Sequence, residues 1–319
     1  MNRFTLILGL LATMFCTSCK KDKENFRGIE GISFENYPKV DGSTSARTLN
    51  AMVFCKLLGI SYEWVETDIL SHEWYVRPKA NDVPKQYMDF FDRQIVTSQT
   101  NGAFMNLIYG DADIILTHRT ISPDEKAHAD AIGVTLIETP IALDAFVFIV
   151  NKENPVKSLT VDEIQKIYTK EITNWVQVGG NNTDMQVFTR PRNSGSEEVL
   201  RTLVMGGLEP ADFPPRFEIA GMSFVFLEVS NEQDGICYTF KNYKDVQVRI
   251  SDNEVPSIAI NGIFPDETTI KDETYPFISK VHVAIRSDLD HNSMAYKLYE
   301  WLQSEDAKST IIECGFIPK

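Results

Sequence analysis

Apolar residues follow two spacings along this chain, and the change between them predicts where strands give way to helices. Continuous apolar runs predict buried β-strands at residues 112–116, 142–150, 235–238, 246–250 and 277–285. Apolar positions three or four residues apart predict helices at 46–58, 103–109 and 295–312, and further helices starting near residues 122, 158 and 194. Strands that alternate with helices predict an α/β fold with a parallel or mixed sheet in each half of the chain.

Two stretches interrupt the alternation. Residues 62–92 combine tryptophans, prolines and charges with weak periodicity, and we expect a strand and loops there. The polar stretch 151–155 ends the longest apolar run and predicts a boundary between two lobes.

Three turns rich in small hydroxyl residues each connect a short predicted strand to a predicted helix; these strands lie within 29–40, in the run that starts at residue 94, and near residues 188–190. Their residues are Ser43-Thr44-Ser45, Thr100-Asn101-Gly102 and Ser194-Gly195-Ser196. The first N–H groups of a helix have no partner inside it, so each turn presents donors to an anion. Ser194 and Glu197 form a capping box that predicts a helix start at Ser194, and Arg190 adds a guanidinium nearby. The turns predict an anion site; the alternative is that Ser194 only caps a surface helix while Arg190 lies in solvent.

Composition and charge narrow the function classes. The chain has 319 residues, 43% hydrophobic and 24% charged, which is enough for two globular lobes. Its formal net charge is -14, which disfavours nucleic acid and anionic membrane surfaces as partners. An anionic ligand therefore requires a local positive site.

The N-terminus is typical of an export signal. Arg3 precedes a short apolar stretch, 4–15, that is too short to span a membrane. The small residues before Cys19 and the polar tract after it resemble a bacterial lipobox, which implies a signal peptide at 1–18, lipidation of Cys19 and a tether at 19–28. The alternative is a plain signal peptide cleaved elsewhere.

Cysteine and histidine give no metal signature. Cys55, Cys237 and Cys314 are odd in number and have apolar neighbours, so we expect buried small hydrophobic residues and no disulfide framework. The histidines show no ligand spacing, and we expect no metal and no cofactor.

Several stretches, in this order, resemble the phosphate-binding proteins of phosphate ABC importers, within the periplasmic binding protein superfamily. The stretches are 37–45, 110–114, 159–164, 172–175, 178–180, 190 with 194–196, 235–238, 274–277 and 313–318. The resemblance runs from about residue 37 to the C-terminus. It implies an α/β, two-lobed type II fold with a mixed sheet in each lobe and an anion cleft between them. The lobes implied are 29–145 plus 257–319, and 146–256.

The resemblance also implies the ligand-binding residues. They fall in the three turns and on two further positions: Ser43, Thr44, Ser45, Thr100, Asn101, Gly102, His118, Arg190, Ser194, Gly195 and Ser196. His118 stands where the family carries an Asp that accepts a proton from bound phosphate. The alternatives are that His118 is a structural residue outside the pocket and that Arg119 points in instead. Glu197 is a second departure, because its charge repels an anion unless it reaches back to the Ser194 N–H.

The function implied is a lipid-anchored receptor, not an enzyme, that binds phosphate or a close oxyanion and delivers it to an ABC importer permease. We expect a monomer in the bacterial cell envelope, held to the membrane only by its lipid. One alternative is a sensor or surface interaction protein on the same fold. A phosphoester hydrolase is disfavoured, because Ser194 and Ser196 lack a G-x-S-x-G elbow and a base spaced with them.

Overall fold

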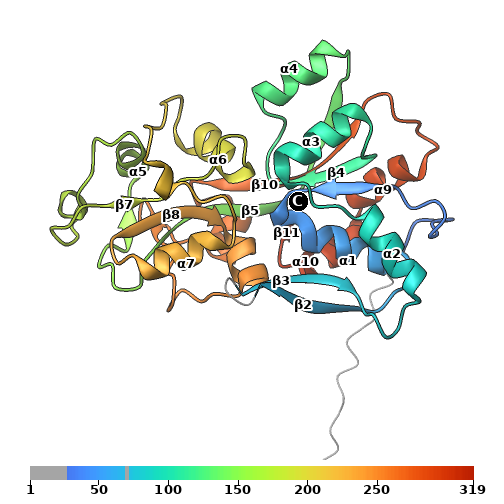
Figure 1. Cartoon of the computed structure of the whole chain (residues 1–319), viewed down its shortest axis with the longest axis horizontal. Helices are drawn as coiled ribbons and strands as arrows, with labels where there is room; N and C mark the ends of the chain where they lie inside the picture. Colours follow the sequence, from blue (N-terminus) through green and yellow to red (C-terminus); the bar gives the residue numbers. More distant parts are fainter. Residues whose placement is uncertain (1–26, 69–71) are drawn as a thin grey trace, which may run out of the picture.

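A computed structural model describes residues 27–68 and 72–319 and shows two α/β lobes side by side (Figure 1). The predicted signal peptide, Cys19 and most of the tether lie outside the described residues. Within the described part, no helix is long and apolar enough to cross a membrane.

The elements follow the chain from one lobe to the other and back. The first lobe contains β1 (Val40–Gly42), α1 (Arg47–Leu57), β2 (Tyr62–Asp68), β3 (Glu73–Pro78), α2 (Lys85–Gln94), α3 (Gln99–Tyr109), β4 (Ile114–Thr117) and α4 (Pro123–Ala131). After β5 (Leu136–Val150) come β6 (Ser158–Leu159), α5 (Val161–Tyr168), β7 (Gln186–Val187), α6 (Gly195–Val199), α7 (Phe224–Asn231), β8 (Gly235–Phe240), β9 (Ala259–Ile260) and α8 (Glu267–Lys271). The last elements are β10 (Ile278–Arg286), α9 (Met294–Leu302), α10 (Glu305–Glu313) and β11 (Ile317–Pro318).

Short 3₁₀ and π-helical turns complete the chain. They are η1 (Thr44–Ala46), η2 (Trp175–Val178), η3 (Leu200–Val204), η4 (Pro215–Phe217) and η5 (Tyr243–Val248). Two of them, η1 and η5, meet at the site described below.

Strand β5 joins the two lobes. The strand order is β1-β4-β10-β5-β8-β7, with β11 also paired to β5. The first part of β5 pairs antiparallel with β10, and its last residues pair antiparallel with β8. Because β1 runs parallel to β4 and β7 runs parallel to β8, the sheet on each side is mixed. The predicted α/β fold with a mixed sheet in each lobe is confirmed.

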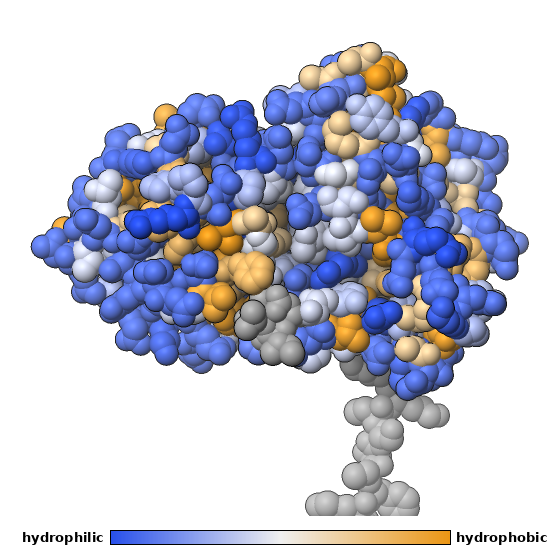
Figure 2. Space-filling view, viewed as in Figure 1, coloured by the Kyte–Doolittle hydropathy of each residue, from blue (hydrophilic) through white to orange (hydrophobic). Residues whose placement is uncertain are grey.

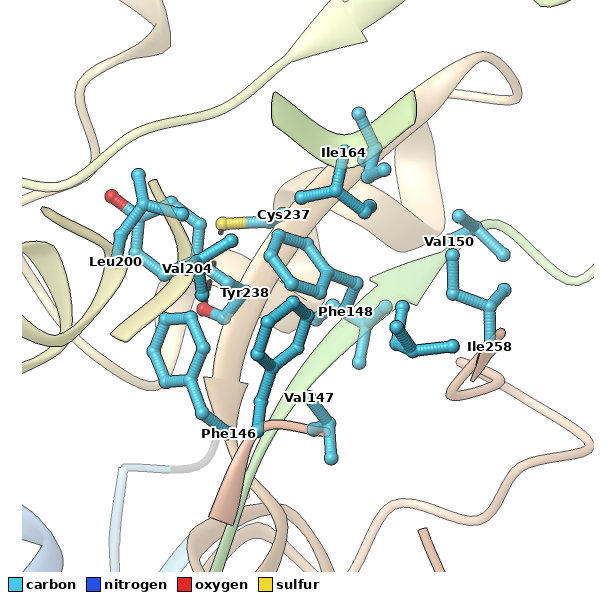
Figure 3. Packing of buried hydrophobic residues seen from close by; sticks show 14 of the residues in the cluster. Phe146, Val147, Phe148, Val150, Ile164, Leu200, Val204, Cys237, Tyr238 and Ile258 are labelled. Atoms are coloured by element: carbon cyan, nitrogen blue, oxygen red, sulfur yellow. Dashed lines mark hydrogen bonds between the residues drawn. The ribbon is translucent and has the colours of Figure 1, made fainter. Parts of the chain in front are cut away.

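Each lobe has its own hydrophobic core. Buried residues of β5, β8, α5 and η3 form the second-lobe cluster, in which Phe146 and Phe148 lie beside Tyr238 (Figure 3). The first-lobe cluster gathers α1, β4, β10, α9 and α10. The predicted buried thiols are confirmed, since Cys55, Cys237 and Cys314 are free and buried, and burial raises the pKa of Cys55 and Cys237 to about 12.

The packing of residues 258–277 bears on the lobe boundary. Ile258, Ile270 and Phe277 belong to the second-lobe cluster, and β9 pairs with β6 of that lobe. The predicted boundary at residue 257 stays a prediction, and this packing favours a second lobe that continues to the start of β10.

Three predicted elements are wrong. Residues 246–250 are not a strand, because Tyr243–Val248 form the π-helical turn η5. The single helix predicted at 295–312 is two helices, α9 and α10, separated where Ser304 begins a new helix. The stretch 62–92 holds a β-hairpin and the helix α2, whose apolar positions the charges around them obscured.

Candidate anion-binding site

A small cavity lies where the two lobes meet, with a volume of about 40 Å³. It is lined by Ser43, Thr44, Ser45, Gln99, Thr100, Arg190, Ser194, Gly195, Ser196, Ala220, Met222 and Phe240. The lining brings together residues from all three turns singled out in the sequence. An accessible volume of roughly 10–15 Å³ is enough to hold one water molecule, so the cavity suits a ligand of a few heavy atoms.

Asp41 holds the two first-lobe loops together. Its Oδ1 accepts hydrogen bonds from the backbone N–H of Gly42 at 2.7 Å and of Ser98 at 2.9 Å, and its Oδ2 accepts from Asn106 Nδ2 at 2.7 Å. Gly42 is required at the turn because a Cβ there would lie 2.6 Å from the Leu116 carbonyl oxygen. One buried carboxylate thus fixes the loop before η1 against the start of α3.

The backbone at both loops leaves donors free. The N–H groups of Ser43 and Ala46 bond to Leu116 and Ser43 carbonyls, while those of Thr44 and Ser45 begin the turn η1 and have no acceptor within it. Helix α3 begins at Gln99, so its first N–H groups are free in the same way. These donors accompany the hydroxyls of the lining residues.

Arg190 supplies the positive charge from the second lobe. Its side chain is buried, with the residue 8% exposed. Nη1 donates to the Ile219 carbonyl oxygen at 2.8 Å, while Nε has no hydrogen-bond partner. Burial lowers the pKa of Arg190 from its ordinary value, yet a guanidinium stays charged at neutral pH. Across the described residues, no carboxylate lies within salt-bridge distance of this buried cation.

Helix α6 begins as predicted, but the capping box is only half formed. Ser194 is the N-cap, and its Oγ accepts from the Glu197 N–H at 3.3 Å. The Glu197 carboxylate does not reach back to Ser194; it pairs with Arg201 Nε at 2.8 Å and accepts a hydrogen bond from the Tyr238 hydroxyl. Burial raises the pKa of Glu197, and the hydrogen bonds from Tyr238 and Arg201 oppose that shift. The reach-back expected from the sequence is therefore wrong.

His118 lies behind the cavity and does not line it. Its Nδ1 is 2.8 Å from Ser45 Oγ, and its Nε2 is 3.2 Å from Asp144 Oδ2. Arg119 does not point in either, because its guanidinium binds Glu125 through two contacts of 2.7 Å. His118 therefore contacts the cavity lining through a hydrogen bond to Ser45 and through its ring, which packs on Phe240 at 4.4 Å between centroids.

Two other predicted ligand residues also lie outside the lining. Asn101 faces a separate surface groove with Met105 and Asn193. Gly102 is inside α3, where a Cβ would lie 3.0 Å from the Cβ of Ser98. Of the second predicted loop, Thr100 lines the cavity, next to Gln99.

The lobes touch directly across the cavity. Gly195 of α6 packs against Thr100 of α3 so closely that an added Cβ would collide with the Thr100 hydroxyl. Gln247 of η5 donates from Nε2 to the Ser45 carbonyl oxygen at 2.7 Å. With Gly195 against Thr100 and Gln247 bonded to Ser45, the lobes are in a closed arrangement.

Sequence reasoning missed several residues that shape the site. Asp41 carried a signal, since it is a carboxylate at a strand end directly before the first turn. Gln247 carried no such signal, because a strand was predicted for its segment, 246–250. Asp144 was hidden inside the apolar run that forms β5, and Tyr238 inside β8.

A larger groove of about 560 Å³ lies elsewhere, and two of its lysines are paired with carboxylates. Lys241 pairs with Asp245 at 2.6 Å, and Lys308 pairs with Glu305 at 2.7 Å. The face in Figure 2 is mostly hydrophilic, with apolar residues in small groups. The small cavity differs from these surfaces because it contains a buried, unpaired cation.

Comparisons with known proteins agree with this architecture. Residues 76–306 match the PBP superfamily domain. The chain is 26% identical over 196 residues to the phosphate-binding protein PstS of Bacillus subtilis, covering 61% of this chain and 61% of the relative. It is 33% identical over 114 residues to protein SphX of Synechococcus elongatus, covering 34% of each chain. PstS of Borreliella burgdorferi is 23% identical over 232 residues, which is 71% of this chain and 78% of that protein. The chain thus spans 61% and 34% of the length of the first two relatives.

Solved structures share the fold. A substrate-binding protein with bound phosphate from Clostridium perfringens superposes with a TM-score of 0.63 at 21% identity, covering 88% of this chain and 98% of that chain. An ABC-type phosphate transport receptor from Vibrio cholerae gives a TM-score of 0.58 at 24% identity, covering 87% and 98%. With the domain match spanning most of its length, the chain belongs to the PBP superfamily and has the two-lobed type II fold.

Proposed function

We propose that the protein is the substrate-binding component of a phosphate ABC importer and that it holds phosphate, or a close oxyanion, in the cavity between its lobes. The observation that carries the proposal is Arg190, a buried guanidinium without a carboxylate partner, facing a cavity of hydroxyls. An uncompensated buried charge is strongly unfavourable, by about 3–5 kcal/mol where one partner of a buried pair is removed. An oxyanion in the cavity would remove that penalty.

The lining suits a tetrahedral oxyanion. Hydroxyls of Ser43, Thr44, Ser45, Thr100, Ser194 and Ser196 and the N–H groups of the turns supply neutral donors around one cation. Each hydrogen bond to a charged partner is worth about 1.5–3 kcal/mol. The relatives named as phosphate-binding proteins support phosphate as the ion.

The hydrolase alternative has one feature in its favour, a serine, a histidine and an aspartate in contact. Ser45, His118 and Asp144 follow one another at 2.8 and 3.2 Å. The relatives bear the names of binding proteins, and we assign binding rather than catalysis.

Arg190→Ala tests the proposal by isothermal calorimetry with inorganic phosphate. Wild type should bind phosphate, and the variant should lose at least about 100-fold in affinity, because a charged hydrogen-bonding partner and its positive charge are both removed. Arg192→Ala is the matched control, since Arg192 is an exposed arginine two positions away. It should bind phosphate as wild type does. Wild type that binds no phosphate would reject the assignment.

Anchoring and delivery belong to the same proposal. Cys19 would carry the lipid, the residues after it would form the tether, and the closed lobes would be presented as a monomer to the importer permease from the outer side of a bacterial membrane. Metabolic labelling with a palmitate analogue should mark wild type but not Cys19→Ala. If cells lacking the protein take up phosphate normally but fail to respond to its depletion, the sensor alternative replaces import.

A further inference from the structure

The cavity contains no carboxylate among its lining residues. Phosphate at neutral pH carries at least one proton, and a bound ion with a proton needs a hydrogen-bond acceptor facing it. Hydroxyl groups can donate or accept, so the direction of their hydrogen bonds decides which ions the cavity prefers. On one side of the cavity that direction follows from a hydrogen-bonded series of four side chains, Asp144, His118, Ser45 and Ser43.

The hydrogen-bonded series starts at Asp144, which is buried in β5 and 4% exposed. Its Oδ1 accepts from two backbone N–H groups, of Ala145 at 2.7 Å and of Asn242 at 3.0 Å. Its Oδ2 faces His118 Nε2 at 3.2 Å. Hydrogen bonds from N–H groups favour the ionised carboxylate, which can only accept, so the proton between Asp144 and His118 belongs to Nε2.

His118 connects Asp144 to the cavity. A ring with its single proton on Nε2 offers a lone pair at Nδ1, and Ser45 Oγ at 2.8 Å then donates to it. Ser43 Oγ lies 3.1 Å from Ser45 Oγ, and since the Ser45 proton is engaged, Ser43 must be the donor between them. Both serines line the cavity, and their oxygen atoms then have only lone pairs left to offer.

We propose that Asp144 and His118 orient the Ser45 and Ser43 hydroxyls as hydrogen-bond acceptors, so that this side of the cavity selects an oxyanion that carries a proton, such as hydrogen phosphate, over a fully ionised one, such as sulfate. The inference rests on the proposed function, because it concerns the same cavity. Asp144 and His118 are positioning residues, and neither touches the ion. The donors on the opposite side are Arg190, Thr100 and the α6 turn.

Asp144→Asn should reverse the direction of the hydrogen bonds from residue 144 to Ser45 without removing any of them. Because Oδ1 is held by two N–H groups, the carbonyl oxygen of the new amide takes that place and its NH₂ group faces His118. The ring must then accept at Nε2 and carry its proton on Nδ1, and Ser45 accepts from the ring and turns its own proton toward the cavity. Calorimetry should show phosphate affinity lowered by about 10- to 100-fold, the effect of one charged hydrogen bond, while sulfate affinity is unchanged or higher.

The tautomer can be measured directly. The ¹⁵N chemical shifts of His118 should place the proton on Nε2 in wild type and on Nδ1 in Asp144→Asn. Ser45→Ala should also lower phosphate affinity more than sulfate affinity. Ser196→Ala, which removes a hydroxyl from the opposite side, should weaken both ions by a similar factor.

The outcomes separate this inference from the proposed function. If wild type binds phosphate through Arg190 but Asp144→Asn weakens phosphate and sulfate equally, the inference fails and the receptor assignment stands. Wild-type His118 with protons on both nitrogens would likewise overturn it. If wild type binds neither ion, the receptor assignment itself fails.

Discussion

Two buried arginines lie close to the lobe interface and differ in what neutralises them. Arg119 of the first lobe is 7% exposed and Arg190 of the second is 8% exposed. Arg119 binds Glu125 through two contacts of 2.7 Å, while Arg190 has only a carbonyl oxygen and a cavity beside it. Nε has no hydrogen-bond partner in either residue. The two residues are equally buried, so burial alone does not distinguish a structural arginine from one proposed to bind a ligand.

The difference lies in whether the fold supplies the anion. Glu125 lies in the first turn of α4, where it also accepts the Ser122 N–H at 2.9 Å, so the carboxylate facing Arg119 is fixed by a helix cap. The corresponding carboxylate near Arg190 is Glu197, and it is drawn away by Tyr238 and Arg201. The fold neutralises Arg119 with its own carboxylate and leaves Arg190 without one, as the proposed oxyanion site requires.

The strongest way to break this comparison is Glu125→Gln, which makes Arg119 a buried cation without a carboxylate. Removing one partner of a buried pair should lower the free energy of unfolding by about 3–5 kcal/mol, measured by urea denaturation. Phosphate should still raise the melting temperature of this variant, because the Arg190 cavity is untouched.

Asp124→Asn is the control, since it removes an exposed carboxylate from the same helix turn. Its unfolding free energy should change by less than about 1 kcal/mol. A Glu125→Gln variant as stable as this control would mean that Arg119 does not need its partner, and the contrast with Arg190 would lose its energetic basis.

Gly195→Ala should have the next largest effect, and it tests whether the Arg190 site works only when the lobes close. The added Cβ would collide with the Thr100 hydroxyl across the interface. Overpacking of this kind costs about 1–3 kcal/mol, so phosphate affinity should fall by roughly 5- to 150-fold in calorimetry.

The matched experiment is a double-mutant cycle with Thr100→Ala. Once the hydroxyl is gone, Gly195→Ala should have little further effect on phosphate affinity, so the two changes should not add. Additive losses would show that the alanine acts on the α6 turn itself rather than through contact between the lobes.

Much of the fold was predictable because its elements are locally encoded. The apolar run of β5 and the helix start near residue 122 carry their own signals, and the structure confirms both. The helix predicted to start near residue 158 begins slightly later, with Thr160 as its N-cap. The segment η5 failed because its buried residues, such as Val248, face a core assembled from distant strands, and its apolar run looks like that of a strand.

The cavity was predictable for a similar reason, and its supporting residues were not. The turns containing Thr44, Thr100 and Ser194 can be recognised in the sequence by their small hydroxyl residues, and the structure brings all three together. The role of Asp144 depends on partners far away in the sequence, His118 and Asn242, so no local pattern reveals it. Asp144→Asn, described above, tests the hydrogen bonds that run from Asp144 through His118 to Ser45.

Glu197→Gln is expected to give the smallest effect, and it tests the carboxylate that the Arg190 site keeps at a distance. Burial raises the pKa of Glu197 in the folded state, so the folded protein binds more protons than the unfolded chain once the pH exceeds about 4.5. Unfolding free energy should then fall as pH rises through the range between the unfolded and folded pKa values. The variant lacks this titration and should show a flatter profile in urea denaturation across that range.

The same substitution should raise phosphate affinity a few-fold, because it removes a negative charge whose field reaches Arg190. Glu198→Gln is the control, since Glu198 is the neighbouring carboxylate on the same helix turn and is absent from the cavity lining. If Glu197→Gln weakened phosphate binding instead, the pairing with Arg201 and the Tyr238 hydrogen bond would be holding the Arg190 loop in place. The open arginine site would then depend on its nearby carboxylate for shape, much as Arg119 depends on Glu125 for charge.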